Sequence, residues 1–200
     1  MAIAHGLGHS WERVDVPNGF VMIATEMPGE YVTAILESLE AAGLKVCVDG
    51  GWGVDALVGE QTRRHADLDL VIDMKDLSAA GKALEAIGFR QDPSAEPGLP
   101  SRYVTTDGDG RQVDLHPLLF DEKGNGWQRL SETGRSWGRY PAPDLNHRGT
   151  INGREVMCLS PELQFSFRLG YEWSDRDEHD LRLLDARFGV GPFPPGASLH

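Results

Sequence analysis

Two kinds of periodicity alternate along the middle of the chain. From Glu30 to Ala42 the apolar residues recur at three- and four-residue steps, and Gly43 follows them. This spacing is typical of an amphipathic helix that ends at a glycine. From Asp67 to Asp73 acidic residues recur at alternate positions, with Val71 as the one exception, and apolar residues fill the positions between them. That pattern predicts a strand with carboxylates on one face and apolar side chains on the other.

The C-terminal third contains local turn and capping signals. Asn152-Gly153 is a type I′ turn signal, which favours a hairpin. Ser160-Pro161 is an N-cap followed by proline at the first helical position, and Asp175 with Glu178 resembles a capping box. The expected elements of this region are a hairpin over 149–159, a helix from 161 to about 172 and a helix from 175 to about 187.

Interruptions in these patterns divide the chain into parts. Residues 1–28 contain repeated glycine and proline, which predicts an N-terminal extension of uncertain order with one strand at 20–24. Residues 29–120 are the expected core, 121–190 a C-terminal part whose first half shows no clear period, and 191–200 a tail. The core is also expected to contain strands at 45–49, 102–105 and 112–118, and helices at 52–57 and 76–87.

Composition narrows the class of protein. The chain has 200 residues, of which 40% are hydrophobic and 25% charged, which suits a folded domain rather than a disordered chain. With 19 Lys and Arg against 31 Asp and Glu, the net charge is −12. This charge disfavours nonspecific binding of nucleic acid and is compatible with a cationic substrate, although it also serves solubility alone.

Cysteine content and hydropathy bear on the cellular compartment. Two cysteines, Cys47 and Cys158, are too few for a disulfide framework, and no group of His and Cys has the spacing of a zinc site. No run approaches the roughly 20 apolar residues of a membrane span, and the N-terminus lacks the pattern of a signal peptide. We therefore expect a cytoplasmic protein without membrane contact, and the sequence leaves a homodimer open.

Three features carry candidate chemistry. Gly50-Gly51 stands between an expected strand and an expected helix. Asp67 and Asp69 share one face of a strand. Asp114 lies on a later strand and is a candidate either for a ligand of a second metal ion or for a base. Mg²⁺ prefers carboxylate and phosphate oxygens, and glycines let the backbone approach phosphates at a helix N-terminus. Together these residue types suit nucleotidyl transfer with two metal ions.

Each feature also has an ordinary structural explanation. An Asp-x-Asp pair is commonly a solvated strand face, Gly-Gly is commonly a turn, and Asp114 is then an exposed edge residue. Their conjunction in this order favours the chemical interpretation. Arg63 and Arg64 are candidate phosphate ligands, since guanidinium groups suit phosphate, and one of the two is expected to be solvated. His65 either contacts phosphate, orients an aspartate, or packs at the strand entrance.

One segment of the chain resembles a known family. The residues DGGWGVDALVGEQTRRHADLD, over 49–69, closely resemble the small lincosamide nucleotidyltransferases and, less closely, the aminoglycoside 2″-nucleotidyltransferases. Both families belong to the DNA polymerase beta-like nucleotidyltransferase superfamily. The resemblance continues at VDLHP over 113–117, at GYE over 170–172 and at RDEHD over 176–180, so it spans about residues 30–187 with gaps.

This resemblance implies an α+β fold: a nucleotidyltransferase core of mixed sheet with flanking helices, and a small helical C-terminal part that binds the substrate. It places metal ligands at Asp67 and Asp69, and a third carboxylate, often the general base, at Asp114. Gly50 and Gly51 match the glycines that approach the phosphates. The acceptor pocket is expected in the C-terminal part. Its expected residues are Tyr171, Glu172, Asp177 and Asp180.

The predicted function is Mg²⁺-dependent transfer of a nucleoside monophosphate from an NTP to a hydroxyl of a lincosamide or aminoglycoside-type antibiotic. Two alternatives remain: transfer onto a protein or tRNA, and a noncatalytic nucleotide-binding relative. The complete carboxylate set disfavours the noncatalytic alternative, and the acidic composition disfavours tRNA. The sequence of residues 49–69 favours a lincosamide, whereas the net negative charge favours an aminoglycoside. The identity of the acceptor therefore stays open.

Overall fold

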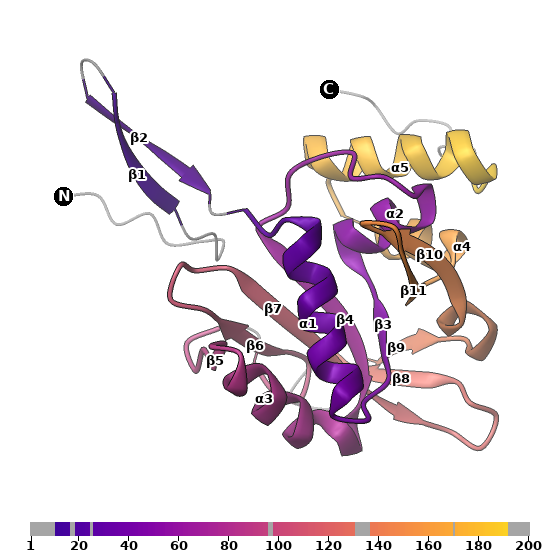
Figure 1. Ribbon diagram of the computed structural model, residues 1–200. Helices are drawn as coiled ribbons and strands as arrows, with labels where there is room; N and C mark the ends of the chain where they lie inside the picture. The colour runs from indigo at the N-terminus through magenta and orange to yellow at the C-terminus, as the bar shows by residue number, and fades with distance from the viewer. Residues whose placement is uncertain are drawn as a thin grey trace.

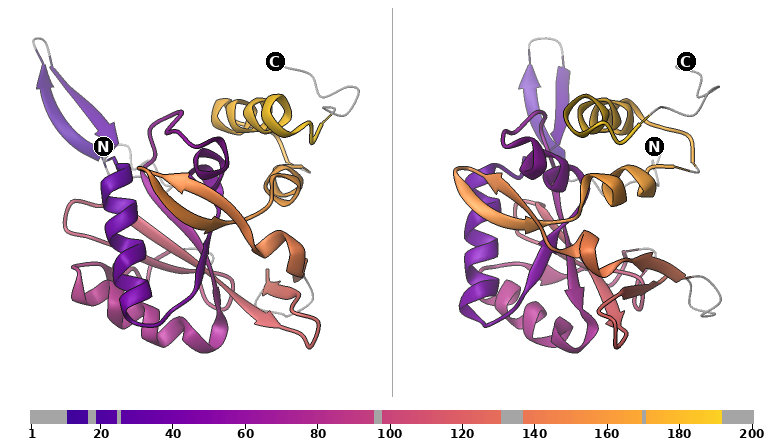
Figure 2. Two further views of the ribbon diagram at one scale, coloured as in Figure 1. Left: turned by 45° about the vertical axis from the view of Figure 1, so that its right-hand side comes forward. Right: turned by 90° about the vertical axis from the view of Figure 1, so that its right-hand side faces the viewer.

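A computed structural model describes residues 11–16, 19–24, 26–95, 98–130, 137–169 and 171–191. A nine-stranded mixed sheet with flanking helices dominates these residues (Figures 1 and 2), which confirms the predicted α+β class. In spatial order its strands are β10 (His147–Ile151), β11 (Arg154–Cys158), β3 (Val46–Val48), β4 (Asp67–Asp73), β7 (Gln112–Phe120), β6 (Tyr103–Thr106) and β5 (Arg90–Gln91), with β8 (Gly126–Arg129) beside β7 and β9 (Trp137–Tyr140) beside β8.

The main core lies between the sheet and two helices. Helices α1 (Gly29–Ala41) and α3 (Leu77–Ala86) cover one face of the sheet, with α3 lying at an angle to α1 (Figure 1). The apolar positions of the alternating strand β4 pack against them, as the alternation predicts. This leaves the acidic positions of β4 on the opposite face. Core residues from α1, β4, α3 and β7 include Val32, Leu39, Leu68, Leu70, Ile72, Leu84, Val113 and Leu115.

Three further helices gather at one end of the sheet. They are α2 (Gly50–Val58), α4 (Pro161–Phe167) and α5 (Asp175–Phe188), which lie close together in Figure 2. Helix α2 contributes both to the main core and to a cluster with the two C-terminal helices. Val54, Phe165 and Leu181, one from each helix, form a small buried cluster. This buried cluster holds the two C-terminal helices against α2.

Among the helices of the described residues, none combines the length and apolar character needed to cross a membrane.

The N-terminal segment contains a hairpin. Strands β1 (Trp11–Val16) and β2 (Gly19–Ala24) pair antiparallel and stand away from the main sheet (Figure 1). The strand expected at 20–24 is confirmed, and its partner strand was not predicted. The first ten residues of the extension and the tail from residue 192 onwards lie outside the described residues.

The turn residues of the C-terminal hairpin adopt the conformation that the sequence predicts. Asn152 and Gly153 both have positive φ, 49° and 76°, as a type I′ turn requires, and they join β10 to β11. Ser160 caps α4 as expected, its hydroxyl accepting from the Leu163 backbone N–H at 3.0 Å.

The end of α4, the capping box of α5 and the strands β5, β8 and β9 differ from the prediction. Helix α4 ends at Phe167 instead of about residue 172, because the Arg168 carbonyl accepts the Trp173 indole N–H at 2.6 Å rather than a helical N–H. The N-cap of α5 is Ser174, whose capping box is completed by Asp177, not Asp175 with Glu178. The segment without a clear period contains β8 and β9, which extend the sheet from the end of β7.

Candidate active site

Three acidic side chains meet where β4 and β7 run side by side. Asp67 and Asp69 occupy alternate positions of β4 and so share a face. Asp114 of β7 lies directly opposite Asp69 in the parallel register. Asp114 is buried, whereas Asp67 and Asp69 are partly exposed. The sheet thus presents three carboxylates on the face that α1 and α3 leave open.

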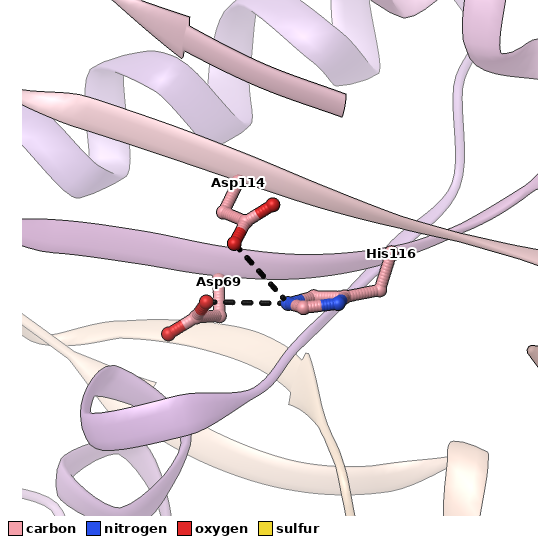
Figure 3. Close-up of side chains that lie close together, drawn as sticks. All are labelled: Asp69, Asp114 and His116. Carbon is pink, nitrogen blue, oxygen red and sulfur yellow. Dashed lines mark hydrogen bonds and ion pairs between the residues drawn. The ribbon is translucent and has the colours of Figure 1, made fainter. Parts of the chain in front are cut away.

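His116 joins this cluster from two positions further along β7 (Figure 3). Its Nε2 lies 3.2 Å from Asp69 Oδ1 and 3.8 Å from Asp114 Oδ2. Ligand atoms of the three side chains lie within 4.8 Å of one another, close enough to share one cation. Arg102 pairs with Asp114 Oδ2, while Asp114 Oδ1 is buried with no hydrogen-bond partner in the described part of the chain. A buried carboxylate oxygen with spare capacity suits a metal ion or a proton.

The electrostatic environment shifts the pKa values of the clustered side chains in different directions. Burial, reinforced by the charge of Asp69, raises the pKa of Asp67 to about 6. Burial also raises the pKa of Asp114, although His116 and Arg102 oppose the shift. Burial acts in the same direction on Asp69, but the hydrogen bond and charge of His116 hold its pKa below the usual value. Burial favours a lower pKa for His116, yet Asp69 and Asp114 raise that pKa to about 9, so the ring carries positive charge among the carboxylates.

A glycine turn faces the carboxylates from the start of α2. Gly50 has a φ of 61°, a left-handed conformation that glycine adopts without strain. A β-carbon at Gly50 would collide with the Asp69 side chain. One at Gly51 would lie 2.5 Å from Nδ1 of His65, which belongs to the loop after α2. Asp49 caps the helix, accepting from Gly50 N–H at 2.6 Å. The first N–H groups of α2 therefore lie beside Asp69, where they favour an anion such as phosphate.

His65 lies beneath this turn in a buried pair with Asp55. Its Nε2 is 2.5 Å from Asp55 Oδ2, and each side chain is 1% exposed. Asp55 Oδ1 accepts from the Thr62 N–H at 3.1 Å and from the Thr62 hydroxyl at 2.6 Å. The ring also packs against Trp52, with centroids 4.7 Å apart. His65 thus supports the loop between α2 and β4 at the strand entrance and does not line the cleft above it.

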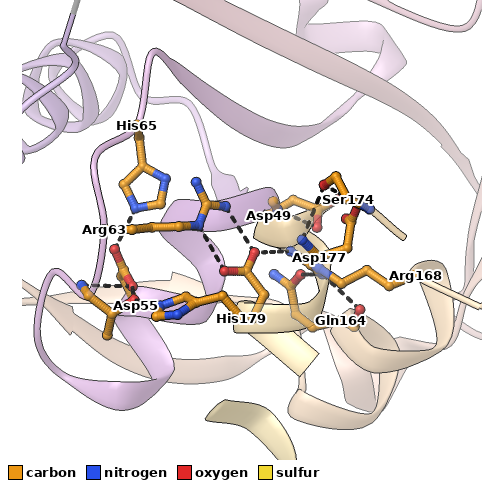
Figure 4. Close-up of polar contacts among 12 residues, drawn as sticks. Asp49, Asp55, Arg63, His65, Gln164, Arg168, Ser174, Asp177 and His179 are labelled. Atoms are coloured by element: carbon orange, nitrogen blue, oxygen red, sulfur yellow. Dashed lines mark hydrogen bonds and ion pairs between the residues drawn. The ribbon is translucent and has the colours of Figure 1, made fainter. Parts of the chain in front are cut away.

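A cleft of about 540 Å³ opens between the carboxylates and the C-terminal helices. Arg63 enters it from the loop before β4, and Arg168 from the end of α4 (Figure 4). Phe167 and Tyr171 add aromatic surface. Of the residues predicted from sequence, those that line the cleft are Gly50, Gly51, Arg63, Asp67, Asp69, Tyr171, Asp177 and Asp180.

Besides His65, two further predicted residues, Arg64 and Glu172, lie outside the cleft lining. The Arg64 side chain is 66% exposed and pairs with Glu26, as expected for one of the two arginines, whereas Arg63 lines the cleft. Glu172 is exposed and is not part of the cleft lining. Asp114 lies immediately behind the lining, against His116.

Sequence reasoning missed four residues at the site, one of which is His116, two positions after Asp114 on β7. Asp49, directly before Gly-Gly, carried a recognisable N-cap signal. Arg102 precedes β6, whose antiparallel register places Val104 opposite Asp114, so an alignment of the two strands would have brought Arg102 close. Arg168 had no local signal, since it reaches the cleft only because α4 stops just before it.

Comparison with known proteins finds similarity along most of the chain. The family model described as aminoglycoside-2″-adenylyltransferase matches residues 31–184. A lincosamide resistance protein of Staphylococcus haemolyticus is 28% identical over 151 residues, which cover 75% of this chain and 89% of that protein.

Two solved structures share the fold. The lincomycin-bound crystal structure of lincosamide antibiotic adenylyltransferase LnuA is similar with a TM-score of 0.69 and 27% identity, over 81% of this chain and 99% of that one. The solution structure of antibiotic-resistance factor ANT(2″)-Ia is similar in fold, with a TM-score of 0.61 and 21% identity, over 82% of this chain and 84% of that one. The family model covers well over half of the chain. This chain belongs to the aminoglycoside-2″-adenylyltransferase family and is a nucleotidyltransferase enzyme.

Proposed function

We propose that this enzyme transfers the nucleoside monophosphate of a Mg²⁺-bound NTP to a hydroxyl of a small antibiotic, with a lincosamide as the first expected acceptor. The observation that carries the proposal is the convergence of Asp67, Asp69 and Asp114 beside the glycine turn of α2. Carboxylates for metal ions, helix N–H groups for phosphate and a base for the hydroxyl are what this transfer requires.

Asp67 and Asp69 are the residues that would hold Mg²⁺, with Asp114 as a further ligand if two ions bind, as we expect. Mg²⁺ takes oxygen ligands, and the spare Oδ1 of Asp114 and the clustered carboxylates fit that preference. When bound, Mg²⁺ neutralises charge on the phosphate oxygens. His116 and Arg102 offset part of the carboxylate charge and so help to keep the acids together.

Where Oδ1 of Asp114 does not bind a metal ion, Asp114 is instead the candidate base. The acceptor hydroxyl would lose its proton to Asp114 as its oxygen bonds to the α-phosphorus, and the bond from that phosphorus to the pyrophosphate oxygen would break. Arg102 occupies Asp114 Oδ2, so Oδ1 is the oxygen available for the proton. Gly50 and Gly51 would accommodate the phosphates against the N-terminus of α2.

The acceptor class rests on the relatives. The lincomycin-bound adenylyltransferase is matched over 99% of its chain, and the curated relative is a lincosamide resistance protein, which supports a lincosamide and ATP as the pair of substrates. The family description names an aminoglycoside enzyme, so an aminoglycoside is the second acceptor class. A reaction that uses ATP is expected in the cytoplasm.

Mass spectrometry tests this proposal directly. The protein is incubated with Mg²⁺, each of the four NTPs in turn, and a panel of lincosamides and aminoglycosides. We expect one nucleoside monophosphate to be added to a lincosamide with ATP, and no product when EDTA removes the metal. Modification of aminoglycosides alone would correct the acceptor class. No added mass on any acceptor with any NTP would overturn the proposal.

A further inference from the structure

Two arginines at the cleft are held by one buried carboxylate. Asp180 of α5 is 2% exposed. Its Oδ1 accepts from Arg63 Nε at 2.9 Å, and its Oδ2 accepts from Arg63 Nη2 at 2.9 Å and Arg168 Nη2 at 3.1 Å. Figure 4 shows Arg63 and Arg168 approaching the same place from different parts of the chain. A single side chain thus joins the loop before β4, the end of α4 and α5 at the cleft.

Each arginine is also fixed from a second direction. The loop that carries Arg63 is tied to α5 again by His179, whose Nε2 lies 3.0 Å from Thr62 Oγ1. Arg168 Nη1 donates to the Gln164 carbonyl and side-chain oxygens, both at 2.8 Å. Gln164 in turn packs directly on α2, where the absence of a side chain at Gly53 makes room for its amide. Both guanidinium groups are therefore preorganised.

The negative charges that line the cleft explain why oriented guanidinium groups are needed there. Asp49, Asp67 and Asp69 line it beside the glycine turn, and a triphosphate would bring further negative charge. Arg63 and Arg168 line the same cleft, and Arg63 Nη2 lies against Gly51. Guanidinium groups bind phosphate oxygens through paired N–H donors, provided that their planes are correctly oriented.

We propose that Arg63 and Arg168 bind the part of the NTP that leaves as pyrophosphate, and that Asp180 is the positioning residue that orients both guanidinium groups. This inference rests on the proposed function and assigns Asp180 to the nucleotide rather than to the acceptor. Both Asp180 oxygens already accept from guanidinium groups inside the protein, which leaves no exposed acceptor for a substrate ammonium group.

Positioning and bulk charge predict opposite effects of the same substitution. Asp180→Asn removes a negative charge beside two arginines, so charge alone would tighten the binding of an anion. The same substitution removes the charged acceptor that orients both side chains, so positioning predicts weaker binding. The direction of the change in nucleotide affinity therefore separates the two explanations.

Calorimetric titration of the full chain with Mg²⁺ and a nonhydrolysable ATP analogue, without acceptor, measures that direction. We expect Asp180→Asn to weaken analogue binding by at least about tenfold, because misplaced groups lose much of their contribution. The KM for ATP should rise in parallel, and the KM for the acceptor should not change. Glu178→Gln is the matched control, since Glu178 lies on the same helix but pairs with Arg182, and its affinity should equal wild type. Unchanged or tighter binding in Asp180→Asn overturns the inference.

A second pair of variants keeps the test decisive if Asp180→Asn does not fold, which circular dichroism would reveal. Arg63→Lys and Arg168→Lys keep the charge but remove the planar fork, so each should weaken analogue binding. Wild-type affinity in both lysine variants would overturn the inference. A wild-type protein that does not bind the analogue would instead contradict the proposed function, so the two failures are distinguishable.

Discussion

The carboxylates on the two sides of the cleft differ in what their oxygens already bind. On the sheet side, burial raises the pKa of Asp67 to about 6, and Asp114 Oδ1 is buried without a hydrogen-bond partner among the described residues. On the helical side, both oxygens of Asp180 accept from arginines, and both oxygens of Asp177 accept from neighbouring N–H and O–H groups. The sheet side keeps that free carboxylate oxygen despite its pairs with His116 and Arg102, whereas both oxygens of each helical-side carboxylate are occupied.

This difference indicates which acids are candidate ligands. A carboxylate whose oxygens are occupied stabilises its own surroundings, whereas one with spare capacity and acidic neighbours gains from a bound cation. Proximity to the cleft does not separate the two kinds, since both line it or lie directly behind it. We therefore expect substitutions on the sheet side to change the chemistry, and substitutions on the helical side to change stability or orientation.

Removing one carboxylate of the β4 pair should have the largest effect. Asp67→Asn and Asp69→Asn keep the size of the side chain and remove the charge that a metal ion needs, so turnover should fall by orders of magnitude. The free energy of unfolding should change little, because partly exposed carboxylates seldom support a core. Product formation and urea unfolding measure the two quantities. Near-normal turnover in either variant would remove that residue from the metal site and weaken the comparison.

Asp114→Asn should have the next largest effect and sharpens the comparison within the sheet side. Loss of a general base typically lowers turnover by about 10²- to 10⁴-fold, and we expect a decrease in that range. If Asp114 acts mainly as the base, calorimetry should show that Mg²⁺-dependent binding of the ATP analogue is largely retained. A large loss of analogue affinity would place Asp114 among the metal ligands instead. Unchanged catalysis would exclude it from the site.

Asp55 extends the comparison to an acid that lies outside the cleft and is fully occupied. Asp55→Ala leaves His65 and Thr62 without their buried acceptor, so the free energy of unfolding should fall by about 3 kcal/mol. Arg64→Ala is the control, because it breaks an exposed pair and should change that free energy by less than about 1 kcal/mol. Denaturant titration of both variants measures the difference. Equal effects would show that occupied oxygens do not predict a stabilising role.

The parts of the fold that the sequence predicts are those whose determinants are local. The two-residue alternation of β4 and the turn residues between β10 and β11 specify their structure without help from distant segments. Strands β8 and β9 were missed because β8 depends on pairing with the end of β7 and β9 on pairing with β8, and both show little periodicity of their own. The early end of α4 depends on Trp173, which binds the Arg168 carbonyl.

The residues of the candidate site also differ in whether a local pattern or a long-range contact places them. Asp67 and Asp69 could be assigned because a strand places alternate residues on one face. The pair of Arg63 with Asp180 joins residues 117 positions apart, and no local pattern in the sequence shows that contact. Without it, Asp180 looked like a free acid at the start of a helix, when it is a buried acceptor for two arginines.

The smallest expected effect concerns the exposed start of α5. Asp177 Oδ2 accepts from the Ser174 backbone N–H at 3.0 Å and from its hydroxyl at 2.6 Å, and the two residues form a capping box. Asp177→Ala should therefore lower the free energy of unfolding by about 1 kcal/mol, the usual contribution of a cap. The KM for the acceptor should stay at the wild-type value. Thermal unfolding and steady-state kinetics measure these two quantities.

Ser174→Ala is the matched variant for this prediction, because it breaks the same capping box and leaves the Asp177 carboxylate in the cleft. If Asp177 serves only the helix, the two variants should lose similar stability and neither should alter the acceptor KM. If Asp177 binds a cationic acceptor, its KM should rise in Asp177→Ala alone, since Ser174→Ala keeps the charge. That second result would show that a carboxylate with occupied oxygens still binds substrate. The distinction between the two sides of the cleft would then fail at a partly exposed residue, where water already competes for those hydrogen bonds.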